Sequence, residues 1–184
     1  MYTEYQPSHL LVPYIDSYWE FKGNPDYGMR IHILPDGCTD FIFTLGEVAN
    51  AVEEGSLIMQ PYRSYFVGPM TKYSELVTYT ESIHMFGVRF LPCGLSCFTN
   101  LPLHEFVNSR VSTNEMKAVF DDTFIEKLGE QKHVTDRIRV VEEYLLAYLA
   151  RHYQPADSHV AMAVNMINPV SYTHLRAHET PEHL

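Results

Sequence analysis

The stretch Ile83-His84-Met85-Phe86-Gly87-Val88-Arg89-Phe90 alternates two sets of side chains. Successive side chains of a β-strand point to opposite faces. The even-numbered residues, which are His84 and three apolar residues, would therefore share one face. The odd-numbered residues, which end in Arg89, would share the other. This pattern predicts a strand with one apolar face and one face that carries a buried or surface arginine.

Shorter β-rich runs precede this stretch. We predict strands at residues 31–34, 40–45, 57–59, 64–67 and 76–80. Pro35-Asp36-Gly37 separates the first two, and this order of residues is typical of a tight turn, because proline fixes φ and Asp-Gly tolerates unusual φ. Several short strands at this spacing indicate a sandwich or a barrel.

The pattern becomes helical after residue 91. Short helices are expected at residues 94–99 and 103–108. Ser112 to Glu115 has the form of a capping box, which predicts a helix that ends near Gly129. A third helix is expected to begin at Thr135 or Asp136 and to reach His152, with Arg139 and Glu143 paired on its outer side. The predicted fold class is therefore α+β, with a β-rich first half and helices behind it.

Composition limits the possible functions. The chain has 184 residues, is 46% hydrophobic and carries a formal net charge of −10. Because an acidic chain repels phosphate, this chain alone is a poor candidate for binding nucleic acid. No secretory leader or long apolar span is visible, and Cys38, Cys93 and Cys97 are expected to be reduced thiols, so a cytoplasmic location without membrane contact is predicted.

The last fifteen residues have an unusual sequence. Val170 to Thr180 reads VSYTHLRAHET, which resembles one reading frame of a sequencing-library adapter. Residues 170–184 are therefore interpreted as an artefactual tail that replaces the natural continuation. His174 and His178 are four residues apart, which is a helical ligand spacing, but no further residue supports a metal site there.

Several motifs together resemble one family. These are Tyr5-Gln6-Pro7, Tyr18-Trp19, LPDGCTDFIF (34–43), FVGPMT (66–71), FGVRFLPCG (86–94) and NLPLHEFVN (100–108). In this order they resemble the N-terminal sensor domain of AraC-type transcriptional regulators, in the subfamily whose sensor has no assigned function. The resemblance covers about residues 5–150 and implies a cupin-like β-barrel or jelly roll followed by dimerisation helices.

The resemblance also implies a domain plan. Residues 1–91 would form the sensor barrel, and 92–153 the helical segment of the same domain. Residues 154–169 would be a linker and the start of a truncated helix-turn-helix domain. The expected function is ligand sensing and dimerisation for a regulator whose missing C-terminal domain binds promoter DNA. The expected partners are an unknown small-molecule effector and a second copy of the chain, and no cofactor is expected.

Five residues are candidates for contact with the effector: Trp19, Asp36, Asp40, His84 and Arg89. If the Arg89 face lines the barrel, its guanidinium could bind an anionic ligand with two hydrogen bonds. If that face meets solvent, Arg89 is a surface charge or pairs with an acid such as Glu81. Trp19 could line a pocket or belong to the core. Asp36 and Asp40 could place carboxylates at the barrel mouth or serve the turn.

A small cupin-like enzyme that acts on a sugar or small acid is the main alternative. Metal-dependent cupins use a His-x-His pair, and this chain has none, although His32 and His84 both lie on predicted strands. Neither a catalytic residue nor a metal ligand is assigned, and the chain is not expected to be an enzyme. A third possibility is a scaffold for dimerisation that binds no ligand.

The helix to His152 carries an apolar stripe. Val141, Leu145, Tyr148 and Leu149 lie on that stripe and are the candidates for a dimer interface. The same residues could instead pack on the barrel. An exposed patch of Leu145, Tyr148 and Leu149 would favour the dimer.

Overall fold

The computed structural model describes residues 1–26, 28–33, 35–46, 51–52, 59–78, 82–115, 119–120 and 122–152. Residues Met1–Tyr153 form one compact unit. The predicted linker and helix-turn-helix start at 154–169, and the adapter-like tail at 170–184, lie outside the described residues.

The larger sheet has six antiparallel strands in the order β1-β2-β8-β4-β6-β9. Their bounds are β1 Tyr2–Tyr5, β2 Ile15–Gly23, β8 Ile83–Phe90, β4 Thr39–Thr44, β6 Ser64–Val67 and β9 Arg110–Ser112. Strand β8 pairs with both β2 and β4 and so lies in the interior of the sheet. A β-bulge between Ile15 and Ser17 shifts the register of β2, which places Ile15 and Tyr18 on the same face.

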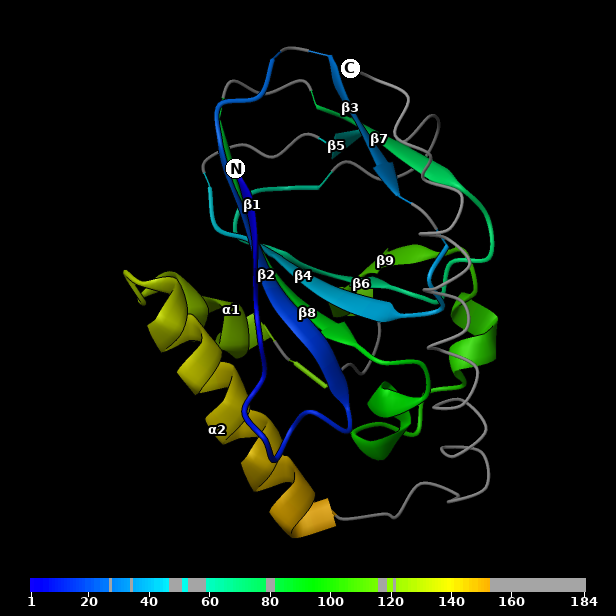
Figure 1. The fold of residues 1–184 in the computed structure, drawn as a ribbon, viewed down its shortest axis with the longest axis vertical. Coiled ribbons are helices and arrows are strands. Elements are labelled where there is room, and N and C mark those ends of the chain that lie inside the picture. Colours follow the sequence, from blue (N-terminus) through cyan, green and yellow to red (C-terminus); the bar gives the residue numbers. More distant parts are fainter. Residues whose placement is uncertain are drawn as a thin grey trace, which may run out of the picture. The chain divides into compact units, whose positions relative to one another are not determined.

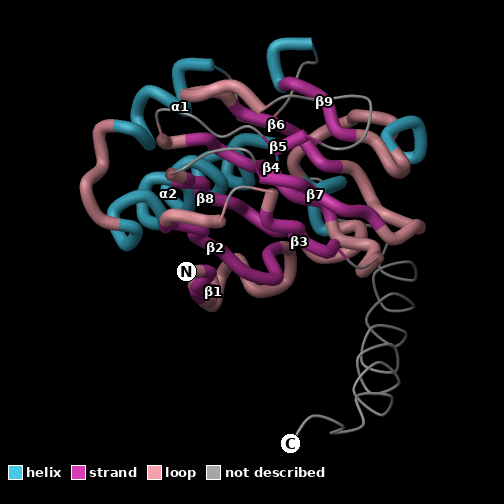
Figure 2. The backbone as a smooth tube through the Cα atoms, turned by 90° about the horizontal axis from the view of Figure 1, so that it is seen from above, coloured by secondary structure: helices cyan, strands magenta, loops and turns pink. Residues whose placement is uncertain are grey.

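A smaller sheet of three strands has the order β3-β7-β5. Its strands are β3 Met29–Ile33, β7 Ser74–Thr78 and β5 Ala51–Val52. Ile33 packs against the apolar cluster on one face of the larger sheet. Figures 1 and 2 together show the smaller sheet stacked beside the larger one, on the side away from the helices.

The helical elements follow β8. Among the described residues, the short 3₁₀ helices are η1 Gly94–Cys97, η2 Leu103–Phe106 and η3 Thr113–Glu115, and the α-helices are α1 Asp122–Gly129 and α2 Val134–His152. Both α-helices contribute side chains to the core on the second face of the larger sheet. Most of the apolar stripe of α2 thus packs against the domain's own sheet, as an amphipathic surface helix does.

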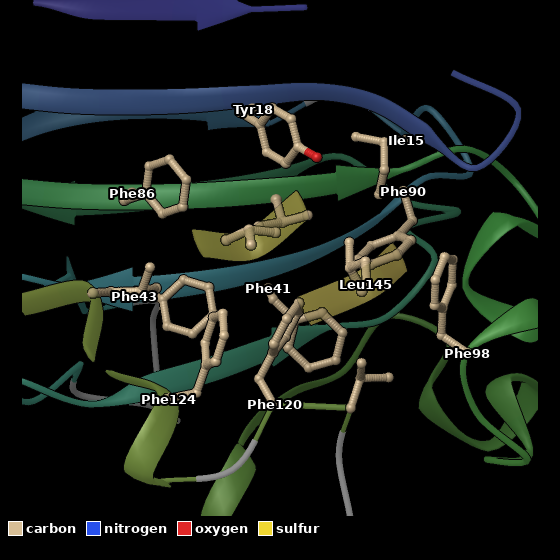
Figure 3. Close-up of a cluster of buried hydrophobic side chains, with 14 of the residues drawn as sticks. Ile15, Tyr18, Phe41, Phe43, Phe86, Phe90, Phe98, Phe120, Phe124 and Leu145 are labelled. Atoms are coloured by element: carbon tan, nitrogen blue, oxygen red, sulfur yellow. The ribbon is translucent and has the colours of Figure 1, made fainter. Parts of the chain in front are cut away.

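Two apolar clusters lie on the two faces of the larger sheet. The cluster on the helix side is rich in phenylalanine, and Figure 3 shows Phe41, Phe43 and Phe86 of the sheet beside Phe120, Phe124 and Leu145. The cluster on the opposite face contains Trp19, Ile42, Tyr65, Ile83 and Met85. The larger sheet is therefore buried on both sides, and the alternation along β8 separates the two clusters as the sequence predicts.

The predicted α+β class is confirmed. Among the described strands the six-stranded sheet is open, with β1 and β9 at its edges. The predicted strands at 31–34, 40–45, 64–67, 76–80 and 83–90 correspond to β3, β4, β6, β7 and β8. Gly129 ends α1, and Arg139 Nη1 lies 3.4 Å from Glu143 Oε1, as expected.

The helix predicted behind Ser112 begins later than expected. Ser112 ends β9 and pairs with Tyr65 of β6, and a short 3₁₀ helix, η3, follows it directly. Val119 and Phe120 are not helical, and α1 begins at Asp122. Of the strand predicted at 57–59, Leu57 and Ile58 fall outside the described residues, and Met59 lies outside any strand. Strand β9 also shows that the segment after residue 91 is not purely helical.

Candidate ligand-binding site

Three neighbouring strands bring the candidate residues together. Strand β8 lies between β2 and β4, and Arg89 is in register with Ser17 of β2 on one side and with Asp40 of β4 on the other. Two residues away, Gly87 is in register with Trp19. Because side chains in register on adjacent strands share a face, Trp19, Asp40 and Arg89 lie on the sheet face opposite the helices.

A polar cluster forms at this position. The indole Nε1 of Trp19 donates a hydrogen bond to Asp40 Oδ1 over 2.8 Å. The Nε of Arg89 donates to the other carboxylate oxygen, Asp40 Oδ2, over 3.3 Å. Asp36 Oδ2 lies 3.9 Å from the same Arg89 nitrogen. We call Trp19, Asp36, Asp40 and Arg89 the Arg89 cluster.

A glycine makes the tryptophan position possible. A Cβ atom on Gly87 would lie 1.9 Å from Cε2 of Trp19, closer than two carbon atoms can approach. The indole therefore lies directly against the β8 backbone, and the ring of Tyr2 lies beside it, with centroids 5.9 Å apart. Trp19 is only 7% exposed, so it belongs to the core and orients Asp40, with little ring surface left for a ligand.

The Pro35-Asp36-Gly37 turn brings Asp36 to the cluster. Asp36 Oδ1 accepts a hydrogen bond from the Cys38 backbone N–H over 2.9 Å, which is an Asx-type turn contact. Gly37 has φ of 71°, in the region that glycine adopts without strain. The two sequence interpretations of Asp36 are thus compatible, since one oxygen serves the turn and the other faces Arg89.

The electrostatics of the cluster are dominated by burial and by Arg89. Burial raises the pKa of the Asp40 carboxyl above its usual value, although the Arg89 guanidinium and the Trp19 hydrogen bond lower it. Burial also raises the pKa of Asp16, again against the effect of Arg89. Burial alone would lower the pKa of Arg89, but the nearby charges, Asp40 first, raise it above its ordinary value. Arg89 therefore stays charged and partly neutralises the negative charge of several nearby carboxylates.

The guanidinium of Arg89 keeps donors available. In the described part of the chain its polar contacts all use Nε. The side chain is 23% exposed, so the terminal nitrogens can meet a ligand or water. Because Asp16, Asp36 and Asp40 surround this one cation, the local balance is acidic, and the simple expectation of an anionic ligand is weakened.

His84 does not join the cluster, because it lies on the helix-side face of β8. Its Nε2 is 2.9 Å from Glu20 Oε1, and the same oxygen accepts a hydrogen bond from Arg137 Nη1 of α2 over 3.0 Å. Arg137 also donates to the backbone oxygens of Leu128 and Gln131. This Glu20–His84–Arg137 network joins the sheet to the junction of α1 and α2. His84 is therefore a residue of a structural network and not of the Arg89 cluster.

The sequence did not reveal that network. Its members lie on β2, β8 and α2, and no local spacing connects them. The available signal was a charged residue among apolar ones. Arg137 falls four residues before Val141 and therefore lies on the apolar stripe of α2.

The predicted dimer residues divide into two groups. Val141 and Leu145 are both 0% exposed and lie in the helix-side core, so they present no exposed surface to a second copy. Their apolar side chains are satisfied by the domain's own phenylalanines. Tyr148 and Leu149 are half-buried and pack at the margin of the same core, and their role in a dimer stays a prediction.

Among the described residues, no group of three or more His, Cys, Asp or Glu side chains could hold a metal ion. No helix in the described part of the chain is long and apolar enough to cross a membrane. Cys38 and Cys97 are buried free thiols and Cys93 is an exposed one. Burial raises the pKa of the Cys38 thiol, and the neighbouring Asp36 adds to this effect.

Fold and site together define an α+β domain whose open sheet carries helices on one face and a buried polar cluster on the other. The family model described as "Domain of unknown function (DUF6597)" matches residues 3–112. The chain therefore belongs to the DUF6597 family. The matched region contains the whole Arg89 cluster, whereas α1 and α2 follow it. A comparison with curated proteins finds no similar sequence.

Proposed function

We propose that this domain is the ligand-sensing half of an AraC-type transcriptional regulator. The DUF6597 family is known from such regulators, and the chain carries the ordered motifs that resemble their sensor domains. In the whole protein a C-terminal domain would bind promoter DNA through a recognition helix in the major groove. The acidic chain described above would not bind DNA by itself.

The Arg89 cluster is the observation that carries the sensing role. A charged arginine and a carboxylate that are largely buried cost free energy to hold, and here they occupy the sheet face that a cupin-like barrel would enclose. Trp19 and Gly87 fix the position of Asp40. The terminal nitrogens of Arg89 would then bind a polar small-molecule effector. In this proposal the smaller sheet forms the opposite wall of a cupin-like barrel.

Ligand binding must reach the helices to act as a signal. Trp19 of the cluster and Glu20 of the helix-side network are consecutive residues on β2. A ligand that shifts β2 would therefore move the partner of Arg137 on α2. We propose that the surface around Tyr148 and Leu149 pairs with a second copy and transmits this shift.

Tryptophan fluorescence tests the sensing role directly, because Trp19 is the only tryptophan of the chain. A panel of polar metabolites would be titrated into the protein while Trp19 emission is recorded. We expect at least one compound to give a saturable shift, and we expect Arg89→Gln to abolish it. Arg139→Gln, which removes an exposed arginine of α2, serves as the matched control and should keep the response.

A compound that binds saturably by calorimetry, leaves Trp19 emission unchanged and binds Arg89→Gln with unaltered affinity would place the ligand elsewhere. Aspartate-to-asparagine replacement at Asp40 gives a second check, since it preserves the acceptor for Trp19 and removes the charge that Arg89 contacts.

A further inference from the structure

A cleft of about 560 Å³ lies away from the Arg89 cluster, between a turn before β6 and the last turns of α1. Its lining residues are Tyr62, Arg63, Ile125, Glu126, Gly129 and Glu130. Its volume falls in the range of sites for small molecules, about 300–1,000 Å³. Its helix wall packs through Phe124 and Leu128 into the helix-side core, so the cleft is on the other side of the larger sheet from Arg89.

The turn that forms one wall is held rigidly. The hydroxyl of Thr44, which is fully buried on β4, accepts a hydrogen bond from the Arg63 backbone N–H over 2.8 Å and donates one to the Gln60 carbonyl over 2.6 Å. The Gln60 N–H donates to the Tyr65 hydroxyl over 2.6 Å. These bonds fix the backbone on both sides of Tyr62, so the wall exists before any ligand arrives.

Tyr62 is held in an unusual conformation at the cleft. Its φ is 52°, in the left-handed region that bulky residues rarely adopt. Tyr62 is 56% exposed, so burial does not compensate the strain. Residues held in this way occur at functional sites, where the surrounding structure over-determines them.

Opposite charges face the cleft without pairing. Arg63 lies on the turn side, and Glu126 and Glu130 lie on the helix side, one turn apart near the negative end of the α1 dipole. Within the part of the chain that the structure describes, the side chains of these three residues form neither ion pairs nor hydrogen bonds. Ile125 also lines the cleft, but it is only 7% exposed, so the exposed Tyr62 supplies most of the apolar surface. The cleft thus places a cation donor, two carboxylates and an aromatic ring around one space.

We infer that this cleft binds a small zwitterion with an apolar body, such as a free apolar amino acid or a short peptide. Its carboxylate would accept hydrogen bonds from the Arg63 guanidinium. Its ammonium group would meet Glu126 and Glu130. Its side chain would pack on the Tyr62 ring. This site is independent of the proposed effector site at Arg89.

Calorimetry on the full chain tests the inference with four probes. L-Leucine and the dipeptide Leu-Leu carry both charges, N-acetyl-L-leucine lacks the ammonium, and L-leucinamide lacks the carboxylate. We expect at least one of the two zwitterions to bind with a Kd at or below about 1 mM. Each single-charge analogue should bind at least about tenfold more weakly, because a charged partner in the cleft is left unpaired. The preferred zwitterion distinguishes a free amino acid from a peptide as the ligand.

Substitutions in the cleft test which residues contact the carboxylate and which contact the ammonium group of the ligand. Arg63→Gln should weaken the zwitterion about tenfold and remove its advantage over L-leucinamide. Glu126→Gln combined with Glu130→Gln should remove its advantage over N-acetyl-L-leucine. Glu143→Gln, at an exposed carboxylate of α2, is the control and should bind like the native chain. All these positions are exposed, so unchanged melting temperatures should show that the fold is intact.

The inference is overturned if neither zwitterion binds saturably at that affinity. It is also overturned if the single-charge analogues bind equally well, or if the variants at the cleft do not alter binding. Binding of L-leucine that shifts Trp19 emission and depends on Arg89 would instead place the ligand at the other site.

Discussion

The indole of Trp19 occupies the space in which any side chain at position 87 would have to lie. A Cβ atom there would be 1.9 Å from Cε2 and 2.3 Å from Nε1 of the indole. The same Nε1 makes the hydrogen bond to Asp40. One missing side chain on β8 therefore determines where the carboxylate of Asp40 is held and, through it, where Arg89 is held.

Gly87→Ala should disrupt this arrangement. The added methyl group must displace the indole or the strand, and it should lower the free energy of unfolding by about 2–4 kcal/mol, from overpacking and from the lost Trp19–Asp40 bond. Urea denaturation measures the loss, and Trp19 emission should move to longer wavelength. Gly129→Ala is the matched control, since a Cβ there meets no atom within 4 Å. Equal stability of the two variants would contradict the close approach.

Arg89→Gln should leave Asp40 as a buried carboxylate without its cation. We expect a loss of about 1–3 kcal/mol at pH 7. Burial already raises the pKa of Asp40, and removing Arg89 raises it further. A group whose pKa is raised on folding contributes most to stability when protonated, so the deficit should shrink as the pH falls from 7 towards 5. Urea denaturation at both pH values checks this, and a deficit that grows on acidification would refute it.

His84 gives the opposite pH dependence. Burial lowers its pKa below the ordinary value, although the hydrogen bond with Glu20 acts against this shift. Its contribution to stability is therefore complete above about pH 6.5, the unfolded value, and is lost as the pH falls below it. Asp16 and Asp40 also change the free energy of unfolding with pH, so the contribution of His84 must be measured by comparing the native chain with a variant. His84→Gln should show a shallower loss of stability between about pH 6.5 and 5 than the native chain. A slope equal to that of the native chain would contradict this role of His84.

Leu145 separates core packing from dimerisation. Because its side chain is fully buried in the domain's own core, Leu145→Ala should cost about 2–5 kcal/mol. That cost should not depend on protein concentration. Leu149→Ala, at a half-buried position, should cost less but should shift the mass measured by sedimentation towards the monomer if the proposed dimer surface is correct. A concentration-dependent cost at Leu145 would instead place that residue in an interface.

The two-residue period of the sequence predicted most of the strands, because the larger sheet is buried on both faces and its strands are therefore rich in apolar residues. Phe86, Val88 and Phe90 face the helices, while Met85 and Arg89 face the other way. Strand β2 was not predicted, because its bulge breaks the alternation between Ile15 and Ser17. Strand β9 was missed because three residues beside a capping-box pattern carry too little periodicity.

The sequence predicted which residues form the candidate site, but it did not predict their arrangement. Trp19, Asp36, Asp40 and Arg89 were all chosen from the sequence, and the structure brings them together. The choice of face for Arg89 needed the positions of the helices, which no local pattern contains. The role of Gly87 depends on an atom of a strand that is distant in sequence. His84 was grouped with Arg89 by residue type, although the two point to opposite faces of β8.

DNA binding by the full-length natural protein that carries this domain tests most directly whether the domain belongs to a transcriptional regulator. In a mobility-shift titration with the promoter region of its own gene, we expect sequence-specific, salt-sensitive binding by the full-length protein. Residues 1–153 alone should not bind. Full-length protein carrying Arg89→Gln should still bind the promoter and lose its response to effector. A full-length protein without sequence-specific binding, or residues 1–153 alone binding as tightly, would contradict a sensor role in a transcriptional regulator.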